Sequence, residues 1–103
     1  MTKKRLRPDD RKEQILNAAI KVAGHPGGWG KLTRDAVARE AQCAEGLVSK
    51  YFGTMVAFRR SIMRAAIGAE NLAVIAQGLA AGDKCAQKAD ESLKRKALET
   101  LAG

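Results

Sequence analysis

Apolar residues recur along this chain every three or four positions, the spacing that places side chains on one face of an α-helix. The first such segment covers residues 10–23, and its apolar face comprises Ile15, Leu16, Ala19, Val22 and Ala23. Asp10 and Glu13 have the spacing of a capping box, so we expect this helix to begin near residue 10. Gly24 suits the left-handed position that often follows a helix, and the glycine-rich segment 24–30 predicts a loop.

Two short apolar stripes follow in segment 32–52, separated by compact residues. Thr33 predicts the N-cap of a first helix, whose apolar positions are Ala36, Val37 and Ala41. The second stripe comprises Leu47, Val48, Tyr51 and Phe52. Two helices of about two turns each are too short to be stable alone. We therefore interpret the pair as a helix-turn-helix, in which the first helix braces the second against the major groove of DNA.

The remaining residues also show helical spacing. Thr54 predicts the N-cap of a further helix, the segment 67–81 is mostly apolar, and Asp83 predicts the start of one last helix that reaches Leu101. Within the helix after Thr54, Arg59 and Arg60 lie on the polar side, where they could touch a DNA backbone. The expected fold is all-α: a basic arm over 1–9, a three-helix, homeodomain-like head over 10–53, and two or three C-terminal helices over 54–103.

Positive charge is concentrated in the part of the chain that holds this head. The net charge is +8, of which +7 belongs to residues 1–60 and +1 to residues 61–103. Such a distribution is what phosphate binding requires, although a solubilising surface has the same appearance. In the arm, the cations that could follow a phosphate backbone or enter a minor groove are Lys3, Lys4 and Arg5. Lys31, just before the second helix, is placed to reach a phosphate.

The order of these residues resembles the DNA-binding domain of the tetracycline-repressor (TetR) family of bacterial regulators. The similarity covers roughly residues 10–65 and is carried by Arg11–Val22 (RKEQILNAAIKV), Leu32-Thr33, Val37-Ala38, Gly46-Leu47-Val48 and Tyr51-Phe52. It implies that residues 44–50 form the recognition helix. The side chains that could face base edges or phosphates are then Gln42, Glu45, Ser49 and Lys50. Phosphate contacts that fix the register are implied for Thr33, Arg34 and Tyr51.

The chain departs from the family pattern at four positions. Ala44 replaces the usual Ser/Thr cap of the recognition helix, and Gln42 stands where glycine is usual, so the turn can differ in shape. Ser49 replaces a common phosphate-binding tyrosine, and Met55 a common lysine. We therefore expect weaker backbone anchoring by the head, with the basic arm and Lys31 compensating.

In the TetR family, the ligand-binding and dimerisation domain that follows the fourth helix is much longer than the segment that follows the fourth helix here. We therefore expect no small-molecule effector. The alternation of small and large apolar residues over 67–101 indicates a helix–helix surface, which serves either a homodimer or packing against the head. A homodimer would place two heads in successive major grooves, on an inverted repeat whose half-sites lie roughly 34 Å apart.

Other classes of function have less support in the sequence. One histidine, two distant cysteines (Cys43 and Cys85) and no phosphate-cradling glycine loop argue against an enzyme, a metal site or a bound cofactor. No apolar run reaches the length of a membrane span, and the N-terminus lacks a signal peptide, so we expect a cytoplasmic protein. The main alternative is a protein-interaction module, such as an anti-activator or antirepressor, built on a repressor-like head.

Overall fold

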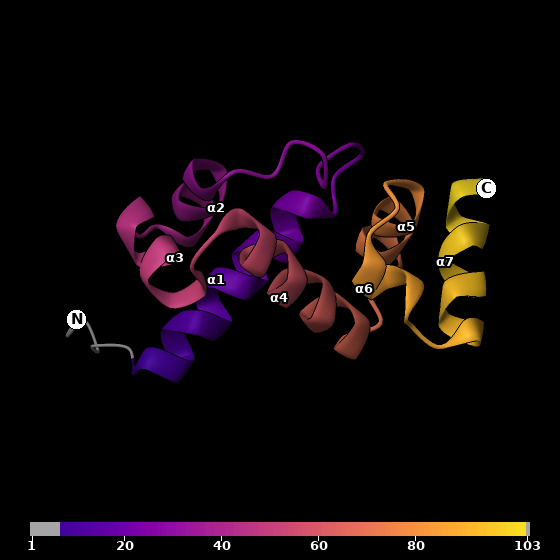
Figure 1. Cartoon of the computed structure of the whole chain (residues 1–103). Coiled ribbons are helices and arrows are strands. Elements are labelled where there is room, and N and C mark those ends of the chain that lie inside the picture. Colours follow the sequence, from indigo (N-terminus) through magenta and orange to yellow (C-terminus); the bar gives the residue numbers. More distant parts are fainter. Residues whose placement is uncertain (1–6, 103) are drawn as a thin grey trace, which may run out of the picture.

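The computed structural model describes residues 7–102, which form seven α-helices and no strand (Figure 1). The first four are α1 (Pro8–Ala23), α2 (Arg34–Ala41), α3 (Glu45–Phe52) and α4 (Met55–Gly68). They are followed by α5 (Leu72–Ala80), the one-turn α6 (Lys84–Gln87) and α7 (Glu91–Ala102). The prediction of an all-α fold is confirmed for these residues.

The molecule is elongated, with extents of 45 × 24 × 21 Å. The helices α1, α2 and α3 gather at one end, α4 runs along the middle, and α5, α6 and α7 form the other end (Figure 1). Helix α1 packs against α2 and α4, and α5 packs against α4, α6 and α7. The C-terminal helices therefore extend away from α3 instead of folding over it.

One apolar core runs through both ends of the molecule. Its largest fully buried side chains are Ile15, Val37, Val48, Phe58, Ile62, Met63, Val74 and Ile75. Gly78 allows the close packing of α5 against its neighbours, because a Cβ atom there would lie 2.3 Å from Met63 Cε and 3.1 Å from Ala86 Cβ. Because the core is continuous, the C-terminal helices support the head through α4.

The first helix begins earlier than the sequence predicted. Pro8 is its first residue, and Arg7 is the N-cap without a side-chain hydrogen bond, so the capping box of Asp10 and Glu13 is not formed. Proline suits this position because its φ is already helical and its missing N–H has no partner to lose. Asp9 and Asp10 lie in the first turn, where the helix dipole favours negative charge. The boundary between arm and head therefore falls before Pro8 instead of after residue 9.

The predicted last helix is divided into two. Asp83 does cap a helix by accepting from the Ala86 N–H, but that helix, α6, ends after one turn. The helix α7 starts where the Asp90 carbonyl accepts from Lys94 N at 2.9 Å. A continuous helix would carry Leu93 and Ala97 away from the core, whereas the turn at residues 88–90 lets α7 lie beside α5 and bury both. Tertiary packing thus overrides the helical spacing.

Candidate nucleic-acid interface

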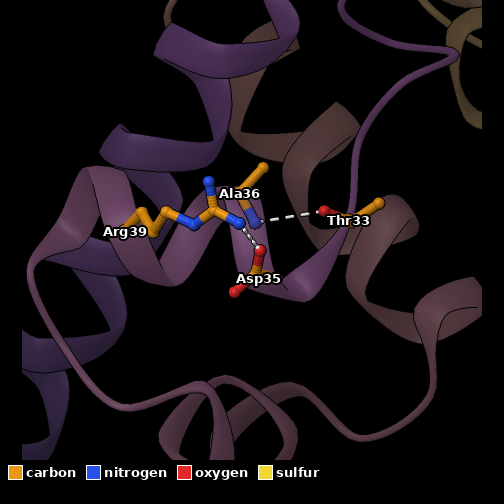
Figure 2. A network of polar contacts seen from close by, with 4 residues as sticks. All are labelled: Thr33, Asp35, Ala36 and Arg39. Atoms are coloured by element: carbon orange, nitrogen blue, oxygen red, sulfur yellow. Dashed lines mark hydrogen bonds and ion pairs between the residues drawn. The ribbon is translucent and has the colours of Figure 1, made fainter.

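The helix α2 begins with the N-cap that the sequence predicted. Thr33 Oγ1 accepts from the backbone N–H of Ala36 at 3.1 Å, as Figure 2 shows. On the outer face of the same helix, Arg39 forms an ion pair with Asp35 one turn earlier. On the inner face Val37, Ala38 and Ala41 are buried against the core. The cap and the buried face together fix where α2 starts and which side it presents to solvent.

The turn between α2 and α3 depends on a left-handed residue. Gln42 has φ 56° and ψ 46°, and its backbone N–H bonds back to the end of α2. Glycine is preferred in this conformation because other residues pay a steric cost there. Gln14 Nε2 also donates to the carbonyl of Ala41 at 3.2 Å, which ties the end of α2 to α1. The Gln42 side chain itself is exposed beside the start of α3.

The helix α3 buries one edge and exposes the other. Val48 is only 1% exposed, and Leu47, Tyr51 and Phe52 are half-buried. Phe52 packs on Phe58 of α4 with ring centroids 4.9 Å apart. The opposite edge of α3 is exposed and carries Glu45, Ser49 and Lys50. Ala44 is the N-cap and makes no side-chain cap bond, so the first N–H groups of α3 lack an intramolecular hydroxyl partner.

Arg34 connects α2 to the end of α3. Its Nη2 donates to the carbonyl of Gly53 at 3.3 Å, and its Nε is buried without a hydrogen-bond partner among the described residues. The side chain is half-buried, so a phosphate contact by Arg34 would have to use the outer guanidinium nitrogens. Lys31 and Thr33 are exposed close to it in the chain, and Lys50 Nζ lies 5.9 Å from the centre of the Tyr51 ring.

The loop before α2 is held by two side chains that the sequence did not single out for this role. Gln77 of α5 donates to the carbonyls of Ala23 and His25, at 2.6 and 2.9 Å, and accepts from Trp29 N at 2.8 Å. Arg59 of α4 donates to the carbonyls of Trp29 and Leu32, and its guanidinium lies 5.1 Å from the Trp29 ring centre. Arg59 is therefore turned inward and is not the backbone contact that the sequence suggested.

The loop lies where the glycine-rich segment predicted it, but one detail of that prediction is corrected. Trp29 is 4% exposed and fills the edge of the core. Gly24 does end α1, but with φ −72° it is right-handed instead of left-handed. Gly28 is the residue with no room for a side chain, because a Cβ there would lie 2.2 Å from the Val22 carbonyl oxygen. A tightly constrained loop thus positions Lys31 and Thr33 in front of α2.

The predicted contacts fall into three groups. Gln42, Ala44, Glu45, Ser49 and Lys50 come together at the turn and along the exposed edge of α3. Lys31, Thr33 and Arg34 lie around the start of α2, and the half-buried Tyr51 stands at the end of α3. The arm cations Lys3, Lys4 and Arg5 lie outside the described residues. The surface carries hydrogen-bond donors, acceptors and positive charge on a short protruding helix, which is suited to polar recognition.

Among residues 7–102, no group of three or more histidine, cysteine or acidic side chains is arranged to hold a metal ion. Nor does any helix in this range combine the length and apolarity needed to cross a bilayer. Comparison with known proteins gives no match to a family model, to a curated protein or to a solved structure. The resemblance to the TetR family therefore rests on the residues named in the sequence analysis.

Proposed function

We propose that this chain is a cytoplasmic transcriptional regulator that binds double-stranded DNA, with a head of the TetR type. The observation that carries the proposal is the division of α3 into a buried edge, centred on Val48, and an exposed edge of Glu45, Ser49 and Lys50. A recognition helix needs this division, because one edge must brace the helix while the other faces base edges. The tail leaves this surface accessible, since α5, α6 and α7 lie at the far end (Figure 1).

The proposed contacts follow from the chemistry of each group. Lys50 can donate to the guanine acceptors, Gln42 can pair with adenine, and Glu45 can accept from the cytosine amino group. Lys31, Thr33 and Arg34 would hold phosphates near the start of α2, and Tyr51 one near the end of α3, so that they set the register of the head. Ala44 makes no side-chain cap bond, so a phosphate could accept from the first N–H groups of α3, ahead of Leu47 N, which bonds to the Ala44 carbonyl. The arm residues Lys3, Lys4 and Arg5 would add contacts along the backbone or in the minor groove.

We further propose that two copies pair through residues 67–101 and act as a small repressor on an inverted repeat. Leu98 and Leu101 on α7 are 50% and 54% exposed, although they are large apolar side chains. Leu98 borders an open groove between α5 and α7 that Leu79 also lines. A second copy seated there would cover this apolar surface and join two heads.

Binding of a mixed-sequence DNA duplex, measured by fluorescence anisotropy at two salt concentrations, tests DNA binding itself. Between about 50 and about 200 mM salt we expect the affinity to fall at least tenfold, because phosphate contacts release counterions. Lys50→Gln should weaken binding, whereas Lys96→Gln, which removes an exposed lysine from α7 at the other end of the molecule, should not. Binding that is absent or insensitive to salt would contradict the proposal and favour the protein-interaction module.

A further inference from the structure

A second concentration of positive charge lies outside the candidate nucleic-acid interface, in an open cleft between α4 and α6. The helix α4 contributes Arg60 and Arg64, and Lys84 and Lys88 come from the α6 side. All four side chains are exposed, and the cleft between them has a volume of about 530 Å³. Its remaining lining is mostly apolar or neutral, from Ile67, Cys85 and Ala89, with Asp90 at one side.

The arrangement of these four cations is electrostatically unfavourable in the free protein. Arg60 and Arg64 are four residues apart on one helix, and Lys84 and Lys88 have the same separation across the turn of α6. Like charges at this spacing repel each other, and here two such pairs face one cleft. The arrangement therefore lowers stability unless an anion lies between them.

Two carboxylates border this charge, Asp90 in the cleft and Asp83 in the adjoining depression, and the four cations remain in excess of them. Asp83 accepts from the Ala86 N–H, and Asp90 accepts from the Ser92 hydroxyl at 2.6 Å. The three ion pairs found among residues 7–102 join Lys21 to Glu40, Arg39 to Asp35 and Lys94 to Glu91. None of them includes a cation of the cleft, so its positive charge is available to an external ligand.

We propose that this cleft is a binding site for phosphate groups. Two guanidinium groups supply paired donors that match phosphate oxygens, and two ammonium groups supply further charge and donors. A second depression adjoins the cleft, sharing Arg60, Lys84 and Cys85, and it is bordered by Val56. Val56 is 70% exposed, so an organic group attached to the phosphate has an apolar surface to rest on. The ligand chemistry is thus a phosphoryl group, of a phosphorylated small molecule or of a DNA backbone that reaches beyond the head.

This inference is independent of DNA recognition by the head, because none of its residues belongs to the surface assigned to α3 and the start of α2. It also differs from the enclosed effector pocket that the sequence argued against, since the cleft is open. The inference can therefore fail while the DNA-binding proposal holds, and the reverse is equally possible.

Thermal unfolding of the full chain, in sodium pyrophosphate and in sodium chloride of equal ionic strength, tests the site. The cleft variants are Lys84→Gln/Lys88→Gln and, independently, Arg60→Gln/Arg64→Gln. The matched control is Lys12→Gln/Lys96→Gln, which removes two exposed charges that line neither this cleft nor the groove between α5 and α7. At ten times Kd we expect pyrophosphate to raise the Tm of the wild type and the control by roughly 6–11 °C. Each cleft variant should lose most of this rise and should melt in chloride no lower than the control.

The opposite results overturn the site. A wild-type Tm that does not rise with pyrophosphate, or that rises equally in all four proteins, shows that these cations do not form a phosphate site. Since all four side chains are exposed, we expect both cleft variants to fold, and circular dichroism in chloride checks this.

A duplex titration then distinguishes the two sources of phosphate. If the DNA backbone occupies the cleft, both cleft variants bind a mixed-sequence duplex several-fold more weakly than the control and with a shallower salt dependence. If the ligand is a free phosphorylated molecule, the duplex affinities of cleft variants and control are equal and pyrophosphate still separates them. Both results support the site and differ only in its occupant.

Discussion

The hydrogen bonds of Gln77 indicate that the C-terminal helices stabilise the head, and a substitution of this residue tests it. Its side chain donates to the carbonyls of Ala23, at the end of α1, and His25, in the loop that precedes α2, and accepts from one N–H of that loop. Both carbonyls lie more than fifty residues away from Gln77 in the sequence. Gln77→Ala removes all three bonds and leaves Trp29 N, which is part-buried, without its acceptor. We therefore expect the loop to loosen and the whole fold to lose stability.

The size of the effect follows from the setting of each bond. At about 1 kcal/mol for each of the two part-buried bonds and less for the exposed one, Gln77→Ala should lower the free energy of unfolding by roughly 2–3 kcal/mol. For a domain of this size, such a loss lowers Tm by roughly 10–20 °C. Gln77→Glu should not rescue it, because a carboxylate cannot donate to the carbonyls of Ala23 and His25.

Thermal unfolding followed by circular dichroism measures this loss, with Gln87→Ala as the matched control. Gln87 is exposed on α6, so its replacement should change stability by no more than about 0.5 kcal/mol. Amide exchange provides a second measurement, since Trp29 N–H should exchange faster in Gln77→Ala. Equal Tm values for the two variants would show that the bonds of Gln77 do not stabilise the loop, and that Trp29 packing and the bonds of Arg59 are sufficient to hold it.

Four further predictions concern the same head, and chemical denaturation measures the free energy of unfolding in each case. Thr33→Ala should lower the free energy of unfolding by about 1 kcal/mol, because Ala36 N–H loses its acceptor, while Thr33→Ser should retain most of it. Gln42→Gly should raise it by about 0.5–1 kcal/mol, since glycine adopts the left-handed conformation without steric cost; a decrease would contradict this. Gly28→Ala should lower it by about 1–3 kcal/mol because its Cβ meets a backbone oxygen. Gly46→Ala should raise the free energy of unfolding by about 0.5–1 kcal/mol, because a Cβ atom at residue 46 would lie in open space.

Local features of the fold could be predicted from the sequence. The N-caps Thr33, Thr54 and Asp83 all accept from the backbone N–H three residues later, because capping depends on one side chain and the turn that follows it. The spacing of apolar residues also indicated the buried faces of α2, α3 and α4, because this spacing depends only on residues within one helix. The candidate contacts on α3 were identified as the polar positions that this spacing leaves outside.

Features that depend on distant residues could not be predicted in this way. The partners of Gln77 and Arg59 lie about 30 to 50 positions away in the chain, so no local pattern reveals them. The break between α6 and α7 arises because α7 packs on α5, although Ala86, Leu93 and Ala97 keep helical spacing across it. The basic cleft between α4 and α6 could not be predicted either, since Arg60 and Lys84 line one cleft only after α6 packs on α4.

Selection of bound sequences from a library of random DNA duplexes tests whether α3 reads a DNA sequence. We expect enrichment of an inverted repeat whose half-sites lie about one helical turn apart or somewhat more, since two heads would enter successive major grooves. Lys50→Gln should change which bases are enriched within each half-site, whereas Lys96→Gln should leave them unchanged. A library that shows no enriched sequence after repeated rounds would contradict sequence-specific recognition by α3.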